Sequence, residues 1–151
     1  MVVLGLDVGS VRIGVAVSDE SETLATPRSF IRRKSNASAI EAIARVVEES
    51  GARLVVVGLP VSFDGQLHSQ AQSVQRFSEK LRVRLDAKLV FADETLSTVR
   101  AEEALRAAGV RPERMRERID SAAAAVILQG YLDQRQQRAH DVAPLGHTEE
   151  I

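Results

Sequence analysis

Near its N-terminus the chain reads VVLGLDVGSVRIGVAVS, residues 2–18, and this stretch decides the fold. Residues 2–8 are almost wholly apolar apart from Asp7, a pattern that predicts a strand buried on both faces. Gly9 and Ser10 are turn residues. Residues 11–18 then alternate between larger and smaller side chains, as the two faces of a second strand would. The stretch therefore predicts an antiparallel hairpin that carries an acidic residue close to its turn.

The remaining sequence predicts a mixed sheet flanked by helices. Five strands are expected in all, over residues 2–8, 11–18, 25–32, 54–59 and 89–92. Helices are expected around residues 40–47, 74–81, 97–105 and 122–132. Ser38 and Glu41 fit a capping box for the first helix, and residues 110–118 read as a charged connector. Right-handed crossovers place the fourth and fifth strands beside the first, so the fold class is α/β with a mixed five-stranded sheet.

Length and composition indicate one domain of an ordinary globular protein. The chain has 151 residues, a net charge of −1 and no cysteine, which excludes disulfides and thiolate metal sites. We expect a single domain over residues 1–133, followed by a polar, flexible tail over residues 134–151. No apolar stretch approaches a membrane span and no secretory signal is apparent. A cytoplasmic protein without membrane contact is expected.

Three acidic residues stand where strands end or helices begin: Asp7, Glu94 and Asp120. α/β sheets present their chemistry at these places. Brought together, the three carboxylates would repel one another unless cations neutralise them, and such ligands suit Mg²⁺ or Mn²⁺. Each position also has a structural alternative, namely a turn-forming Asp7, a solvated strand end at Asp93-Glu94 and an N-cap at Asp120.

Glycines surround the first of these acidic residues. Gly5, Gly9 and Gly14 remove side chains near Asp7, and we expect the space to admit a bulky phosphate.

Most of the basic residues are arginine, whose guanidinium group can form bidentate hydrogen bonds with phosphate. Basic clusters occur in two places, at residues 28–34 and 111–118. The alternative is that both clusters lie on solvated loops. Candidate contacts to a phosphate backbone are Arg12, Arg32 and Arg33.

Four sequence blocks, in order, resemble one known family. They are DVGSVRIGVAVSD at residues 7–19, VGLP at 57–60 with Asp64-Gly65, DETLST at 93–98, and IDSAAA at 119–124 leading into ILQGYL. Together they resemble the YqgF/RuvX family, which has been described both as Holliday junction resolvases and as pre-16S rRNA processing nucleases. The resemblance runs from Val2 to Leu132 and implies an RNase H-like fold.

The resemblance implies a hydrolase that cleaves phosphodiester bonds with two Mg²⁺ or Mn²⁺ ions. By position it makes Asp7, Glu94 and Asp120 both catalytic and metal ligands. The chain departs from the family at Thr95, where an arginine is usual, and at Val11, where a lysine is frequent. Arg100, about one helical turn beyond Thr95, is the candidate substitute for that arginine.

Three functions remain open from the sequence. The favoured one is processing of the pre-16S rRNA 5′ end in ribosome biogenesis, with RNA as the partner. The second is resolution of DNA junctions in recombination or repair, which needs two active sites and so predicts a homodimer. The third is a non-catalytic nucleic-acid-binding module that kept the fold. Sugar kinases and actin-like ATPases open with a similar hairpin, but they need two such domains.

Overall fold

A computed structural model of the whole chain describes residues 1–60, 69–94 and 97–150. The elements follow the order β1 (Val3–Val8), β2 (Arg12–Ser18), β3 (Ala25–Arg32), α1 (Asn36–Ser50), β4 (Leu54–Leu59), α2 (Ser69–Arg84), β5 (Lys88–Asp93), α3 (Ser97–Ala107) and α4 (Pro112–Glu150). The turn expected at Asp64-Gly65 and the position of Thr95 lie outside the described residues.

The strands form one mixed sheet in the order β3-β2-β1-β4-β5. β1 pairs antiparallel with β2, and β2 with β3, so the N-terminal meander is confirmed. β4 pairs parallel with both β1 and β5, as right-handed crossovers require. The carboxyl ends of β1, β4 and β5 therefore lie at one edge of the sheet, which is where the predicted site has to form.

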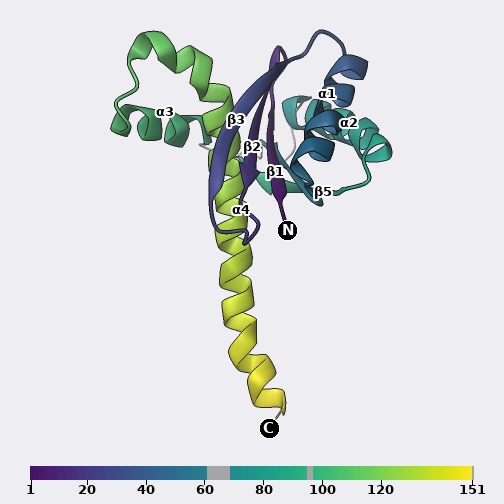
Figure 1. Cartoon of the computed structure of the whole chain (residues 1–151), viewed down its shortest axis with the longest axis vertical. Helices are drawn as coiled ribbons and strands as arrows, with labels where there is room; N and C mark the ends of the chain where they lie inside the picture. Colours follow the sequence, from purple (N-terminus) through teal and green to yellow (C-terminus); the bar gives the residue numbers. More distant parts are fainter. Residues whose placement is uncertain (61–68, 95–96, 151) are drawn as a thin grey trace.

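Helices cover both faces of the sheet (Figure 1). α1 and α2 bury one face, where Phe77, Ile43 and Leu81 pack on the large apolar residues of β1, β2 and β4. α4 crosses the other face, where Leu128 and Leu132 pack on Val3 and Val56. α3 and the first turns of α4 form a separate lobe beside the sheet, and the far end of α4 extends beyond it.

α4 lies unusually close to the hairpin because β1 and β2 carry glycines beneath it. A Cβ on Gly5 would come within 2.7 Å of the Leu128 Cβ, and a Cβ on Gly14 would overlap the Asp120 carbonyl. A Cβ on Gly9 would meet the Arg12 carbonyl oxygen of the same turn at 2.6 Å. The expectation that these glycines leave room for phosphate is therefore wrong, because backbone and helix α4 fill that space.

Three helix starts differ from the sequence prediction. α2, expected around residues 74–81, begins at Ser69. α1 begins one turn early, since Ser35 is the N-cap and forms a capping box with Ser38. α4 begins at Pro112, so most of the expected connector over residues 110–118 is helical. Proline suits the first helical position because its missing N–H would have no partner there. Asp120 lies eight residues into α4 and so is not an N-cap.

The C-terminal segment is also helical. α4 continues through the expected polar tail to Glu150, while the division into a domain over 1–133 and a tail stays a prediction. Within the described residues, no helix combines the length and the hydropathy that a bilayer crossing needs.

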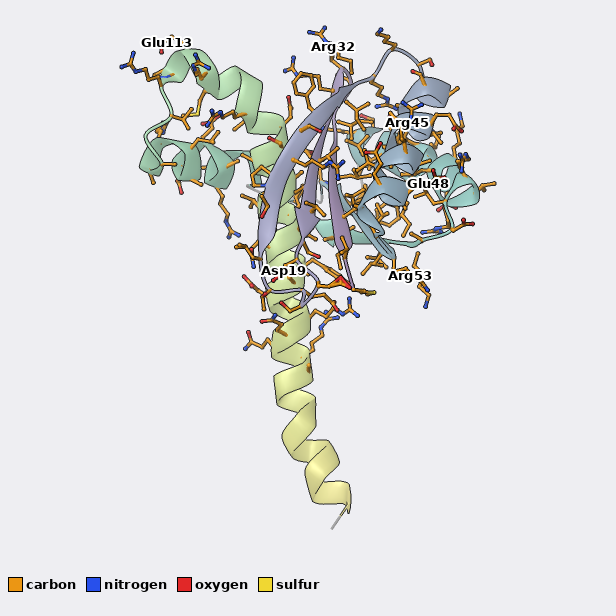
Figure 2. All side chains as sticks on the ribbon, in the orientation of Figure 1. Asp19, Arg32, Arg45, Glu48, Arg53 and Glu113 are labelled. Atoms are coloured by element: carbon orange, nitrogen blue, oxygen red, sulfur yellow. The ribbon has the colours of Figure 1, made fainter. Side chains whose placement is uncertain are left out.

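Asp19 organises the turn between β2 and β3, at the end of the sheet away from Arg32 (Figure 2). Its carboxylate accepts hydrogen bonds from the backbone N–H groups of Thr23 and Leu24 and from the hydroxyls of Ser21 and Thr23. These bonds, that of the Thr23 hydroxyl foremost, hold the pKa of Asp19 well below its ordinary value of 3.8.

We expect Asp19→Asn to lower the melting temperature at pH 7, because a neutral amide accepts these bonds less strongly. A depressed carboxyl pKa stabilises the fold above pH 3.8, and this stabilisation is lost as the pH falls below it. The gap between wild type and variant in thermal unfolding should therefore shrink from pH 7 to pH 3. An equal gap at both values would contradict this role for the charge.

Candidate active site

Asp7 and Glu94 meet at the carboxyl ends of β1 and β5. Asp7 is the fifth residue of β1 and Glu94 directly follows β5, with its N–H donating to the Leu59 carbonyl at 3.2 Å. Both side chains lie on the sheet face that α4 covers, since Gly5 contacts Leu128 and Gly58 contacts Glu94 on that face. The topology thus brings two of the three predicted acidic residues into direct contact.

The carboxyl groups of Asp7 and Glu94 lie in hydrogen-bond contact with one another. Burial raises the pKa of Glu94 to about 8, and the hydrogen bond to Asp7 together with the charges of Asp7 and Asp93 acts in the same direction. Burial also raises the pKa of Asp7, although the bond from Glu94 opposes that shift. Glu94 is therefore the protonated partner near neutral pH and donates to the Asp7 carboxylate. The oxygens of such a pair could hold a cation in place of that proton.

Asp120 lies near this pair but is held by Arg12. Its charge contributes to the raised pKa of Asp7. Its Oδ2, however, accepts from the Arg12 Nε at 2.7 Å, in a partly buried ion pair. In the described part of the chain, no three acidic or histidine side chains converge tightly enough to hold an ion. The predicted three-carboxylate cluster is thus two carboxyls in contact and a third turned toward an arginine.

Gly58 makes room for the Glu94 side chain, a role that sequence reasoning missed. A Cβ on Gly58 would lie 2.8 Å from Glu94 Oε2 and 2.6 Å from the Ile127 Cδ1. The sequence signal for this role was the glycine inside the otherwise apolar strand LVVVGL. A glycine within a strand often marks a place where another group approaches the strand backbone closely.

The four candidate arginines have different surroundings. Arg12 is paired with Asp120 and lies 5.9 Å from the Phe30 ring centre. Arg32 and Arg100 are exposed, and Arg32 lies at the carboxyl-end edge of the sheet (Figure 2). Arg33 instead points inward, where it donates to the Gly9 carbonyl at 3.0 Å and lies 4.6 Å from the Phe77 ring centre. Through these two contacts its guanidinium connects the hairpin turn to α2.

The raised pKa of Glu94 predicts a specific pH dependence of stability without divalent ions. Between pH 4.5 and about 8 the folded protein keeps a proton that the unfolded chain has lost. The free energy of unfolding therefore falls as the pH rises through this window. We expect Glu94→Gln to remove this decline, so that the variant melts several degrees higher than wild type at pH 8 in EDTA but not at pH 4.5. Thermal unfolding at the two pH values tests this, and identical profiles would contradict it.

Comparison with known proteins agrees with the geometry. Residues 1–134 match the family model RuvX, described as Holliday junction resolvase. A protein of Chloroflexus aggregans named "Putative pre-16S rRNA nuclease" is 47% identical over 133 residues, covering 88% of this chain and 94% of that protein. A protein of the same name from Chloroflexus aurantiacus is 41% identical over 147 residues, covering 97% of this chain and 96% of the other.

Solved structures support the same fold. Thermus thermophilus RuvC, in complex with a Holliday junction substrate, has a TM-score of 0.60 at 16% identity and covers 90% of this chain and 96% of its own. At that identity the likeness concerns the RNase H-like fold alone. The family match over residues 1–134, together with relatives above 40% identity, means that this chain belongs to the RuvX family.

Proposed function

We propose that this chain is a divalent-metal-dependent nuclease that hydrolyses phosphodiester bonds at the Asp7–Glu94 pair. The observation that carries the proposal is the contact between two half-buried carboxyl groups, Asp7 and Glu94, at the carboxyl ends of β1 and β5. An acidic pair that is partly shielded from water destabilises the fold unless a proton or a bound cation neutralises it. Membership of the RuvX family supports the same chemistry.

The residues present fit Mg²⁺ or Mn²⁺. Asp7 and Glu94 supply hard oxygen donors in contact with one another, and the negative charge of Asp120 is close enough to act on Asp7. Asp7 and Glu94 would hold one or two ions, and Asp120 would join them once it is released from Arg12. When bound, the ions would lower the pKa of an attacking water and stabilise charge on the leaving oxygen.

Arg12 and Asp120 would change partners when substrate arrives. The Arg12 Nε now occupies one Asp120 oxygen at 2.7 Å, and this pair is only partly buried. A phosphodiester offers Arg12 an alternative anion, and its departure would free the Asp120 carboxylate for the cation site. The contact thus orients Asp120 in the free protein, and its release would leave Arg12 to bind the scissile phosphate in the complex. Arg32 and Arg100, both exposed, would contribute further phosphate contacts.

The proposed substrate is the 5′ end of a pre-16S rRNA. Support comes from the names of the relatives at 41–47% identity. A DNA junction is the second candidate, because the family model and the RuvC likeness carry that description. Junction resolution would further require a homodimer with two active sites, which light scattering on the purified protein would detect.

One experiment separates these functions. The protein is incubated with Mn²⁺ and, in parallel, a labelled pre-16S rRNA fragment with a 5′ extension and a labelled four-way DNA junction. An EDTA reaction and Glu94→Gln serve as controls. Metal-dependent trimming of the RNA supports the processing nuclease, and paired symmetric nicks in the junction support the resolvase. Binding without cleavage of either substrate would overturn the nuclease proposal in favour of a binding module.

A further inference from the structure

A cavity lies at the opposite end of the sheet from the carboxyl pair. It has a volume of about 520 Å³ and is lined by Arg53, Lys88 and Arg135, together with Asp86, Val90 and Tyr131. Figure 2 labels Arg53 at this end of the molecule and Arg32 at the other. The volume falls within the range of small-ligand sites.

The charges around the cavity are unbalanced. Arg135 is held by Glu22 at 3.0 Å. Arg53 and Lys88 are exposed and form no ion pair within the described part of the chain, although Asp86 lines the same cavity. Tyr131 lies beside them, partly exposed and without a hydrogen bond from its hydroxyl to any described residue. Two exposed cations beside an aromatic ring suit a phosphate ester that carries a planar base.

Strand β5 connects this cavity to the carboxyl pair. Side chains alternate across a strand, so Lys88, Val90, Ala92 and Glu94 form one row on the face that α4 covers. Lys88 and Val90 line the cavity, Val90 and Ala92 are only partly buried, and Glu94 ends the row at Asp7. The six residue-to-residue steps from Lys88 to Glu94 span about 20 Å. This length corresponds to about six nucleotides of a stacked strand and fewer of an extended one.

We propose that the cavity binds nucleotide units of the substrate strand that leaves the Asp7–Glu94 pair along β5. This inference rests on the proposed nuclease function for the identity of the strand. The phosphates contact Arg53 and Lys88, and a base packs on Tyr131. The cavity therefore serves as a second anchor that selects substrates with a single-stranded extension of several nucleotides.

The test is the affinity for a fluorescein-labelled 12-nucleotide RNA, measured by anisotropy in EDTA so that no cleavage occurs. The variant is Arg53→Glu/Lys88→Glu. Its matched control is Arg45→Glu/Lys80→Glu, which makes the same change in net charge at exposed positions on α1 and α2. We expect only the first variant to bind the RNA about tenfold more weakly. The slope of log affinity against log salt concentration should become shallower by about 1.4, as expected for two lost phosphate contacts. Equal losses in the two variants would overturn the proposal.

Two further arms identify the ligand and separate this inference from the nuclease function. If adenosine monophosphate displaces the 12-mer as effectively as unlabelled 12-mer does, the cavity is a mononucleotide site and the strand proposal fails. With Mn²⁺ added, the cavity variant should lose kcat/KM on the 12-mer about tenfold while kcat stays unchanged, because the substitutions lie about 20 Å from the carboxyl pair. A wild type that cleaves nothing would refute the nuclease function alone, since binding in EDTA still tests the cavity.

Discussion

Replacing Asp7 with asparagine is expected to reduce metal-dependent cleavage on the order of a thousandfold or more. The amide keeps the shape but removes the negative charge that holds the cation beside Glu94. The variant should nevertheless fold, since burial already favours the uncharged form of Asp7. We therefore expect a melting temperature in EDTA at least equal to that of wild type. Single-turnover cleavage tests the expected loss of activity, and thermal unfolding of the same preparation tests the expected melting temperature.

The matched control for this prediction is Asp93→Asn. Asp93 is the last residue of β5, is exposed, and by alternation lies on the face away from Glu94. Its charge acts on Glu94 only at a distance, so we expect less than about a tenfold change in rate. A loss at Asp93 as large as that at Asp7 would place the reaction elsewhere at this strand end.

Gly14→Ala is expected to have the largest effect on stability. A Cβ at this position would overlap the backbone carbonyl of Asp120. A helix backbone cannot adjust locally to relieve such an overlap, whereas a flexible side chain can change its rotamer. α4 would have to move away from β2, at a cost of about 1–3 kcal/mol or more. The shift would also displace Asp120 from Arg12 and Asp7, so cleavage should fall together with the melting temperature. Differential scanning calorimetry and the cleavage assay measure the two effects.

Gly130→Ala, on α4, is expected to have the opposite effect on stability. A Cβ there meets no atom within 4 Å, and alanine is favoured over glycine inside a helix by about 1 kcal/mol. We expect this variant to be slightly more stable than wild type and fully active. A Gly14→Ala protein that melts like wild type would contradict the close approach of α4 to the hairpin.

The sheet and the meeting of Asp7 with Glu94 could be predicted because they follow from local patterns. Continuous apolar runs mark β1 and β4 as central strands, and right-handed crossovers then place β5 beside β4. The carboxyl ends of parallel strands share an edge, so Asp7 and Glu94 had to lie close together.

The features that sequence reasoning missed depend on long-range contacts or on ambiguous local signals. Arg12 and Asp120 are separated by 108 residues, and nothing in either segment indicates that they pair. Arg33 stands beside Lys34 and resembles a solvated residue, yet the Gly9 carbonyl and the Phe77 ring hold it. Pro112 suggests a connector, although proline equally fits the first position of a helix.

The most direct measurement of the central claim is calorimetric titration of Mn²⁺ into wild type and Asp7→Asn at pH 8. If Asp7 and Glu94 form the cation site, wild type binds Mn²⁺ and releases protons as the ion replaces the one on Glu94. The variant should bind at least about tenfold more weakly and release fewer protons. Equal affinity and equal proton release in the two proteins would contradict a metal site at the carboxyl pair.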